Sequence, residues 1–284
     1  MLTFLLISMR PKQWVKNLFV FGPLLFVKAF TDTEKVALTS LAFVCFCIAG
    51  SAVYLLNDCL DKEKDRQHPI KKHRPLASGK LSAFIALTAS LLLGGASLWG
   101  GFMLNRSFGW VLLGYLLLNL FYSLKLKDMI ILDVFCISIG FVLRVVGGAA
   151  VIAVPVSVWI LACTFFLALF LAVNKRKNEL TLGGGETREV LRAYSPEMLE
   201  YMNMVSLSAT VITYAFYTFS SEHSRLLMLT IPIVLYGLFY YLAALARQPE
   251  GAGDPTSIVL KETNLQVTVM LWVLVSGAIL LLAN

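Results

Sequence analysis

The stretch YLLNDCLDKEKDRQHPIKKHRP, residues 54–75, joins the end of an apolar segment to a dense group of acids and bases. Aspartates stand at positions 58, 61 and 65, and lysine, arginine and histidine residues follow as far as Arg74. Charged side chains are costly inside a membrane, so an otherwise apolar chain gathers them where they have a function. These charges therefore indicate a site at a membrane boundary.

The composition places the chain among membrane proteins. Hydrophobic residues make up 58% of the 284 residues, charged residues only 14%, and the mean hydropathy is +0.77. Apolar runs of about 17–25 residues, long enough to cross a bilayer, recur along the whole chain. We therefore expect an all-α polytopic membrane bundle, with residues 1–284 forming a single integral membrane domain. The nine expected spans lie near residues 14–30, 36–56, 81–104, 107–124, 129–152, 156–173, 198–220, 225–246 and 265–283.

The basic residues indicate the orientation of the chain. Nineteen of the 24 Lys and Arg residues fall on the side of the N-terminal tail and four on the opposite side, while Arg144 lies inside a span. Cytoplasmic loops carry such an excess, so we expect the N-terminus in the cytoplasm and the protein in the inner membrane. The net charge of +7 then reflects topology and anionic ligands, and no nucleic-acid partner is expected. The five cysteines lack metal or disulfide spacing and are interpreted as small apolar residues.

The three aspartates of the opening stretch have the spacing of a metal site. If the second span continues as a helix, they are related by i, i+3 and i+7 and share one face, with Asn57 one turn before Asp61. Carboxylates side by side repel one another unless a cation lies between them. All-oxygen ligands suit Mg²⁺, which bridges carboxylates to substrate phosphates. A solvated helix end, with its acids paired to the bases of residues 62–66, is the alternative. We favour Mg²⁺ bound by Asp58, Asp61, Asp65 and Asn57.

Two basic clusters accompany the aspartates. The loop HPIKKHRPLASGK (68–80) offers Lys71 and Arg74 as partners for phosphate oxygens beside the metal, although the positive-inside signal alone also explains them. The segment NKRKNEL (174–180) follows the sixth span, as the aspartates follow the second. This correspondence indicates that the two helix ends meet over one cavity.

Further polar residues lie in or beside the spans. Lys16 and Asn17 belong to RPKQWVKN (10–17), an expected interfacial segment that enters the first span. Asp133 and Arg144 are eleven residues apart in the fifth span, on nearly one helix face and about 16 Å from each other. Charges inside a span favour a function, but pairing with a neighbouring helix explains each of them equally well.

The motifs together resemble those of a known superfamily. NDxxDxxxD followed by HPxKxxRPxxxG, here Asn57 to Gly79, resembles the first motif of the UbiA-type intramembrane prenyltransferases. RPKQWVKN, YSLKLKDMIILD (122–133) and LRVVGGAA (143–150) extend the likeness over nearly the whole chain. The resemblance implies a helical membrane enzyme that uses Mg²⁺.

One departure from the superfamily changes the expected substrate. Ordinary members carry a second aspartate-rich motif after the sixth span, where a second metal holds a prenyl diphosphate. NKRKNEL stands in its place, and a basic patch binds a further phosphate rather than a metal. With LRAYSPEML (191–199), this substitution is similar to the phosphoribosyltransferase branch of the superfamily.

The branch implies two substrates and their residues. The implied donor is 5-phosphoribosyl 1-diphosphate and the implied acceptor is a polyprenyl phosphate. The catalytic residues would be Asp58, Asp61, Asp65 and Lys16. The substrate-binding residues would be Asn17, Asn57, Lys71, Arg74, Tyr122, Lys125, Asp133, Arg144, Lys175, Arg176, Glu179 and Tyr194.

Two other functions compete with phosphoribosyl transfer. A prenyltransferase with an aromatic acceptor would have the same fold, but residues 174–180 would then be acidic instead of basic. A transporter would place its polar site near the middle of the bilayer, whereas these residues gather at one boundary. The sequence leaves the isoprenoid length and the number of Mg²⁺ ions open. A homo-oligomer is compatible with it.

Overall fold

The computed structural model describes residues 1–68, 70–181, 189–220, 225–247 and 254–282, which form helices and loops without a strand. Seven helical segments within these ranges are long and apolar enough to cross a membrane. They are α3 (Thr33–Leu60), α5 (Ala83–Leu104), α6 (Arg106–Leu124), α7 (Leu132–Val151), α8 (Val158–Thr181), η7 with α10 (Arg225–Thr230 and Ile231–Arg247) and α12 (Thr263–Leu282). The all-α membrane bundle is therefore confirmed.

The other two expected spans are helical but differ in character. The segment near 198–220 forms α9 (Pro196–Phe219), which is of spanning length but buries several polar side chains, among them Asn203 and Thr210. The segment near 14–30 is divided into the 3₁₀ helix η1 (Pro11–Phe21), the short helix α2 (Gly22–Phe26) and η2 (Ala29–Thr31). The count of nine spans is not confirmed and stays a prediction.

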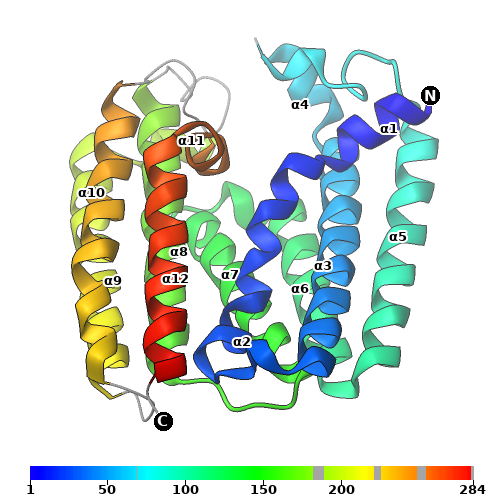
Figure 1. Ribbon diagram of the computed structural model, residues 1–284. Coiled ribbons are helices and arrows are strands. Elements are labelled where there is room, and N and C mark those ends of the chain that lie inside the picture. The colour runs from blue at the N-terminus through cyan, green and yellow to red at the C-terminus, as the bar shows by residue number, and fades with distance from the viewer. Residues whose placement is uncertain (69, 182–188, 221–224, 248–253, 283–284) are drawn as a thin grey trace.

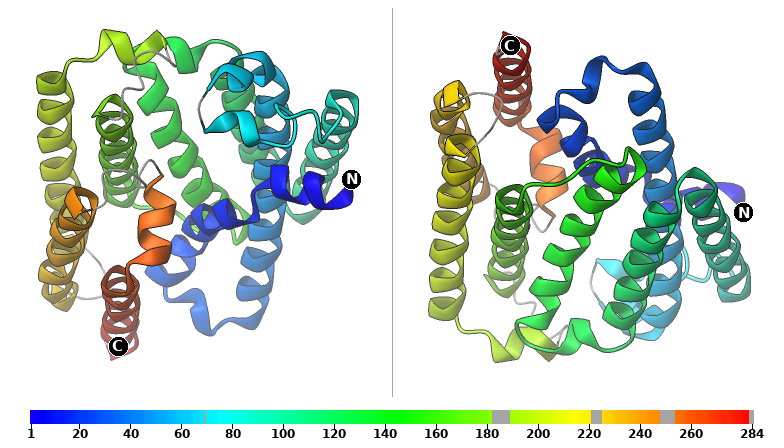
Figure 2. Two further views of the ribbon diagram at one scale, coloured as in Figure 1. Left: turned by 90° about the horizontal axis from the view of Figure 1, so that it is seen from above. Right: turned by 90° about the horizontal axis from the view of Figure 1, so that it is seen from below.

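The long helices stand side by side in a ring around a central space, as the views along the bundle show (Figure 2). Neighbours in the chain are mostly neighbours in the ring, and η1 runs between α3 and α7 (Figure 1). Short elements gather at one end of the bundle, at the top of Figure 1. They are α1 (Leu2–Met9), α4 (Lys62–Gln67), η3 (Lys71–His73), η4 (Leu126–Asp128), η6 (Glu189–Ala193) and α11 (Pro255–Lys261).

Side-chain caps begin two of the spans. Asn105 accepts the backbone N–H of Ser107 at 2.8 Å and so starts α6 directly after α5. Asp32 accepts the backbone N–H groups of Glu34 and Lys35 at 3.1 and 3.2 Å and starts α3. Asparagine and aspartate are favoured there because their oxygens satisfy N–H groups that have no partner within the helix.

A close approach of backbones fixes η1 inside the ring. A Cβ atom added to Gly148 of α7 would lie 2.0 Å from the carbonyl oxygen of Val20 in η1, so no other residue fits there without moving the backbone. Gly148 of LRVVGGAA thus lets η1, with Lys16 and Asn17, lie directly against α7.

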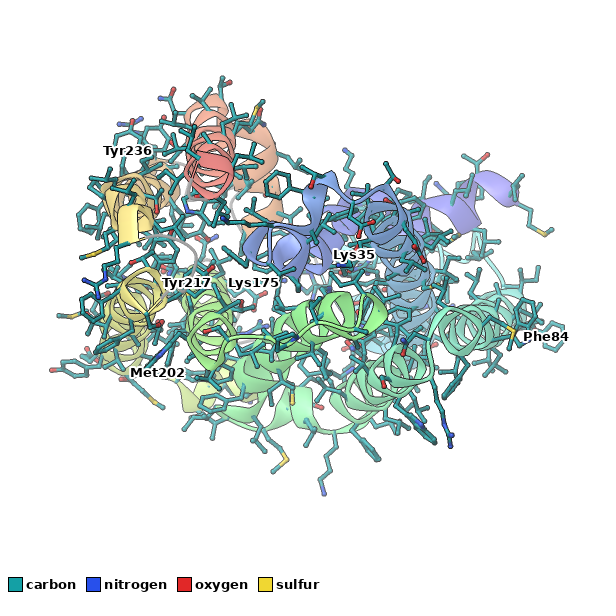
Figure 3. The ribbon with its side chains drawn as sticks, turned by 60° about the horizontal axis from the view of Figure 1, so that its bottom comes forward. Lys35, Phe84, Lys175, Met202, Tyr217 and Tyr236 are labelled. Carbon is teal, nitrogen blue, oxygen red and sulfur yellow. The ribbon has the colours of Figure 1, made fainter. Side chains whose placement is uncertain are left out.

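Large apolar side chains cover the outside of the ring. Phe84 of α5 is 78% exposed and Tyr236 of α10 is 53% exposed, and both lie at the periphery of the bundle, while Lys175 lies near its centre (Figure 3). Apolar residues outside and charged residues inside suit a molecule surrounded by lipid.

Candidate active site

A cavity of about 1580 Å³ lies within the ring of helices. Its apolar wall includes Phe19, Phe26, Phe141, Leu167 and Trp272. Its charged wall carries ten basic and five acidic side chains: Arg10, Lys16, Lys64, Lys71, Arg74, Lys127, Arg144, Lys175, Arg176 and Arg192, with Asp61, Asp65, Asp128, Glu179 and Asp254. The cavity thus combines an apolar chamber with an excess of positive charge.

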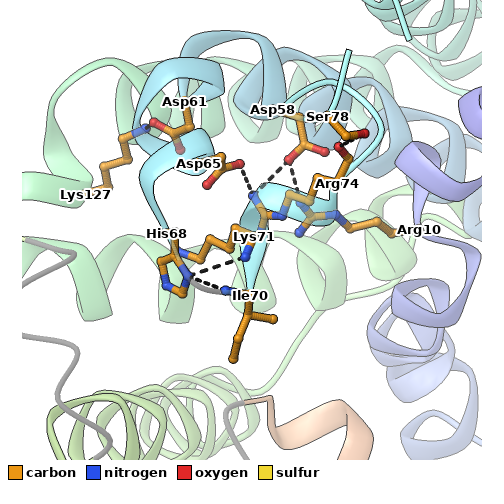
Figure 4. Close-up of polar contacts among 10 residues, drawn as sticks. All are labelled: Arg10, Asp58, Asp61, Asp65, His68, Ile70, Lys71, Arg74, Ser78 and Lys127. Carbon is orange, nitrogen blue, oxygen red and sulfur yellow. Dashed lines mark hydrogen bonds and ion pairs between the residues drawn. The ribbon is translucent and has the colours of Figure 1, made fainter. Parts of the chain in front are cut away.

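Asp58 and Asp65 converge on one guanidinium group. Nη1 of Arg74 lies 3.2 Å from Oδ1 of Asp58 and 2.6 Å from Oδ2 of Asp65 (Figure 4). Nη2 of Arg10 lies 2.5 Å from the same oxygen of Asp58. Asp58 is 2% exposed and does not line the cavity, whereas Asp65 does. Asp58 therefore holds two arginines in place and does not itself reach the cavity.

Asp61 points elsewhere, because the helix is interrupted at this residue. Helix α3 ends at Leu60 and α4 begins at Lys62, so the expectation of one continuous helix was wrong. Oδ1 of Asp61 lies 2.5 Å from Nζ of Lys127, on the other side of α4 from Arg74 (Figure 4). Across the part of the chain that the structure describes, no three His, Cys, Asp or Glu side chains are grouped closely enough to hold one metal ion.

The side-chain oxygens of Asn57, Asp58, Asp61 and Asp65 are nevertheless of the type that binds a divalent cation. Carboxylates of Asp58 and Asp65 already enclose one positive charge, that of Arg74, and Asp61 and Asn57 line the cavity beside them. Carboxylate and amide oxygens are the ligands that Mg²⁺ accepts. Asn57, Asp61 and Asp65 could therefore contact a metal at the cavity, whereas Asp58 lies outside the cavity wall and is paired to Arg10 and Arg74.

His68 shapes the basic loop that follows. Its Nδ1 accepts the backbone N–H groups of Ile70 and Lys71 at 3.2 and 3.4 Å (Figure 4). Partial burial, reinforced by the charge of Lys71, lowers the pKa of His68 below its usual range. Neutral His68 thereby turns the chain so that Lys71 and Arg74 both line the cavity.

A carboxylate from the far end of the chain meets η1. Oδ1 of Asp254, just before α11, lies 3.5 Å from Nζ of Lys16, and Oδ2 accepts a hydrogen bond from Nε2 of Gln13 at 2.5 Å. Thr256 donates to the amide oxygen of the same glutamine at 3.3 Å. Although burial opposes the shift, Lys16 and Lys175 lower the pKa of Asp254. Asp254 is therefore an anion among cations.

Arg144 is held by neutral groups only. Its Nε donates to Oδ1 of Asn17 at 2.7 Å, Nη1 to the carbonyl oxygen of Gly140 at 2.7 Å, and Nη2 to the hydroxyl of Tyr115 at 3.0 Å. Its guanidinium also lies 4.8 Å from the ring centre of Tyr115. No carboxylate of the described residues forms an ion pair with it, so its charge faces the cavity without being neutralised.

The two cations at the end of α8 have different surroundings. Nε of Arg176 lies 2.9 Å from Oδ2 of Asp133, and its Nη1 contacts Glu179. The other oxygen of Asp133 accepts a hydrogen bond from Tyr194 at 2.6 Å, and Tyr194 does not line the cavity. Lys175 lines the cavity and forms no hydrogen bond or ion pair with any described residue. Lys175, rather than Arg176, is the cation available to a ligand.

Of the remaining residues expected in the site, some line the cavity and others lie outside it. Tyr122 lines the cavity, whereas Lys125 is exposed and outside it. Lys127, two residues later, lines the cavity and binds Asp61. The start of η4 at Leu126 turns the chain, so that Lys127 rather than the expected Lys125 lines the cavity, and the substrate-binding role of Lys125 stays a prediction.

Sequence reasoning also missed Arg10, Gln13 and Asp254. Arg10 begins RPKQWVKN, so its place in that motif was a signal. Gln13 and Asp254 are 241 residues apart, and nothing in the local pattern of either connects them.

Fold and site together define an intramembrane bundle with a charged cavity at one end, the class to which membrane transferases of lipid substrates belong. The UbiA prenyltransferase family model matches residues 18–260. The chain belongs to this family.

Three curated relatives that share one name are similar over most of their length. A protein named decaprenyl-phosphate phosphoribosyltransferase from Mycolicibacterium smegmatis is 32% identical, over 95% of this chain and 90% of that one. Proteins of the same name from Mycobacterium tuberculosis and Corynebacterium glutamicum are 31% and 32% identical, over 95% and 94% of this chain and 92% and 83% of theirs.

Solved structures share the fold. A UbiA homologue from Archaeoglobus fulgidus, bound to GPP and Mg²⁺, superposes with a TM-score of 0.75 at 19% identity, over 98% of this chain and 100% of that one. A UbiA homologue from Aeropyrum pernix K1 in its apo form gives 0.67 at 15% identity, over 96% of both chains.

Proposed function

We propose that the protein transfers the 5-phosphoribosyl group of phosphoribosyl diphosphate to a polyprenyl phosphate and releases diphosphate. The names of its relatives support this reaction, and so does the charge of the cavity, which is the single observation that carries it. Ten basic side chains face five acidic ones there. A site for several phosphate groups needs such an excess, because each phosphate monoester carries about −1.5 to −2 charges.

The shape of the cavity suits both substrates. The donor is a small, polyanionic sugar, and the loop of His68, Lys71 and Arg74 offers it a polar wall. The acceptor carries one phosphate on a long apolar chain, and Phe19, Phe26 and Trp272 offer that chain an apolar wall. An acceptor phosphate at the border between the two walls would face the donor.

The reaction needs no general base. An ionised oxygen of the acceptor phosphate attacks C1 of the ribose, the bond from C1 to the diphosphate oxygen breaks, and the diphosphate leaves with the electron pair. The attacking oxygen is already deprotonated near neutral pH, so no proton is transferred. The residues of the site then act by positioning and by charge. Direct displacement inverts the configuration at C1.

Mg²⁺ completes the site in this proposal. Asp58, Asp61, Asp65 and Asn57 would hold it, and when bound it would neutralise charge on the departing diphosphate. Arg74, which now satisfies Asp58 and Asp65, would then be available to the donor. Lys16 would serve the acceptor side.

The rest of the assignment follows from the membrane location of the chain. We infer an inner-membrane enzyme with a single catalytic domain, its N-terminus and cavity opening on the cytoplasmic side, where phosphoribosyl diphosphate is soluble. An aromatic prenyltransferase is the second candidate, because the apolar wall would also accept a prenyl chain.

Transfer of label tests the proposal. Purified protein is incubated with Mg²⁺, phosphoribosyl diphosphate labelled in the ribose, and polyprenyl phosphate, and the lipid fraction is counted. Label should enter the lipid only when all three are present, and polyprenol without its phosphate should remain unlabelled. If the lipid stays unlabelled although a thermal unfolding measurement shows that the protein is folded, the proposal is refuted.

A further inference from the structure

The geometry points to a subsite for the acceptor's phosphate formed by Lys16, Arg144 and Lys175, in which Asp254 is a resident counter-ion that the phosphate displaces. This inference rests on the proposed function and deepens it, because it says which cations serve which substrate.

The three cations come from three elements and face one part of the cavity. Lys16 lies on η1, Arg144 on α7 and Lys175 on α8, and all three line the cavity. Lys16 interacts electrostatically with Arg144, with Lys175 and with Asp254. Like charges repel, so the ring of helices holds them together at a cost that an anion relieves.

Arg144 has donors to spare. A guanidinium carries five N–H groups, and the hydrogen bonds to Asn17, Gly140 and Tyr115 use three of them. These partners are neutral, so they fix the orientation of the side chain and leave its positive charge intact. Such a side chain is preorganised for an anion.

Asp254 is the carboxylate that lies beside two of these three cations, Lys16 and Lys175. Its Oδ1 faces Lys16 at 3.5 Å and forms no hydrogen bond with a described residue, whereas Oδ2 is tied to Gln13. The carboxylate is therefore held by hydrogen bonds from Gln13 and from the backbone of Thr256, while among the described residues Oδ1 is held only by the ion pair with Lys16 at 3.5 Å. A contact of this kind is readily exchanged for a phosphate.

The formal charge of the residues around the subsite matches that of a phosphate once Asp254 has been displaced. The surrounding group contains four cations and three carboxylates: Lys16, Arg144, Lys175 and Arg176, with Asp133, Glu179 and Asp254. Its formal charge is +1 with Asp254 in place and +2 when Asp254 is withdrawn. The second value matches a phosphate monoester near neutral pH, which carries about −1.5 to −2.

The apolar surroundings indicate that the phosphate bound here is that of the lipid acceptor. Phe141 packs against Arg144, with 5.2 Å between its ring centre and the guanidinium, and its ring meets that of Phe19 at 5.0 Å. Both rings line the cavity. A phosphate bound by these cations would therefore lie at the border of the apolar part of the cavity, whereas the loop of Lys71 and Arg74 lies on the polar side.

Direct binding tests the subsite without any transfer. Labelled farnesyl phosphate, a short acceptor analogue, is equilibrated with the detergent-solubilised protein in the absence of donor, with farnesol, inorganic phosphate and phosphoribosyl diphosphate as competitors. Lys175→Met should weaken binding at least about ten-fold, the loss of one charge-assisted contact, and Arg106→Met, at an exposed residue outside the cavity, should leave it unchanged. Farnesol, inorganic phosphate and phosphoribosyl diphosphate should compete poorly.

The direction in which Asp254→Asn changes the affinity for farnesyl phosphate tests the displacement. The amide keeps an oxygen for Gln13 but loses the charge, so farnesyl phosphate should bind about three- to ten-fold more tightly. Weaker binding to Asp254→Asn would show that Asp254 only positions Lys16 and would overturn the displacement. The control variant Lys16→Arg keeps the positive charge, so it should bind farnesyl phosphate as the wild type does. Displacement of the lipid by phosphoribosyl diphosphate would assign the cations to the donor and overturn the subsite. If the lipid binds but no phosphoribosyl is transferred, the proposed function fails and the subsite stands.

Discussion

Arg176 of α8 and Asp133 of α7 form an ion pair inside the protein, with Nε 2.9 Å from Oδ2 and side chains that are 1% and 0% exposed. The sequence predicted both residues as substrate ligands, with a pair to a neighbouring helix as the alternative for Asp133. Their ion pair joins the two helices, and Tyr194 donates to the same carboxylate, while Arg176 also lines the cavity. Their role as substrate ligands stays a prediction. Lys175, the neighbour of Arg176, is left to face the cavity.

Exchanging these two neighbours for methionine should separate stability from activity. Arg176→Met leaves the Asp133 carboxylate buried without its cation, which costs about 3–5 kcal/mol, so the midpoint of thermal unfolding in detergent should fall sharply. Lys175→Met breaks no ion pair within the described structure, so it should unfold like the wild type and lose acceptor affinity.

Arg106→Ala is the matched control, since Arg106 is exposed at the opposite end of the bundle. It should change neither quantity. Equal losses of stability in Lys175→Met and Arg176→Met would show that the division of roles at the end of α8 is wrong.

Asp61 and Asp65 should be needed for turnover. Both line the cavity, so Asp61→Asn and Asp65→Asn should each lose more than nine tenths of the activity at saturating Mg²⁺ while inserting and purifying normally. A tenth of the activity corresponds to only about 1.4 kcal/mol of barrier, which is less than a metal ligand contributes. If either variant retains more than that, the metal assignment fails.

The basic loop should open as the pH falls. The pKa of His68 lies below its ordinary value of 6.5, because burial and then Lys71 disfavour the charged form. The hydrogen bonds from the backbone of Ile70 and Lys71 are therefore present above the ordinary pKa and lost as the pH falls through the lowered one, since protonated Nδ1 cannot accept them.

Hydrogen–deuterium exchange of a peptide covering Ile70 and Lys71, corrected for the intrinsic rate, measures this opening. Protection should drop on acidification in the wild type and stay constant in His68→Gln, whose amide oxygen accepts at every pH. A constant protection in the wild type would mean that Nδ1 does not hold the loop.

The donor's 5-phosphate should contribute to catalysis. Ribose 1-diphosphate lacks the group that would need a cation away from the aspartates, so its kcat/KM should be lower by the equivalent of about 2–4 kcal/mol. Nearly equal values for the two donors would mean that the basic loop recognises only the diphosphate.

The class and most of the helices could be predicted because length and apolar composition determine what crosses a membrane. The interruption at Asp61 could not, since NDCLDKEKD contains neither proline nor glycine to mark it. A helical pattern predicts which residues share a face only while the helix continues, and this one does not.

The partners of the charges were less accessible still. The pattern NKRKNEL shows four charged residues near one helix end but not which of them turns toward α7 and which toward the cavity. Asp254 meets Lys16 only because the ring closes, bringing α11 beside η1. Contacts of this range depend on tertiary packing, which a single sequence does not display.

Competition between the two candidate reactions in one mixture tests phosphoribosyl transfer directly against aromatic prenylation. One reaction mixture with Mg²⁺ contains phosphoribosyl diphosphate and polyprenyl phosphate together with geranylgeranyl diphosphate and 4-hydroxybenzoate, each donor carrying a different isotope. We expect ribose label in the lipid phosphate and no prenylated aromatic product. Prenylated aromatic acid forming faster than labelled lipid would contradict this expectation and establish the aromatic prenyltransferase instead.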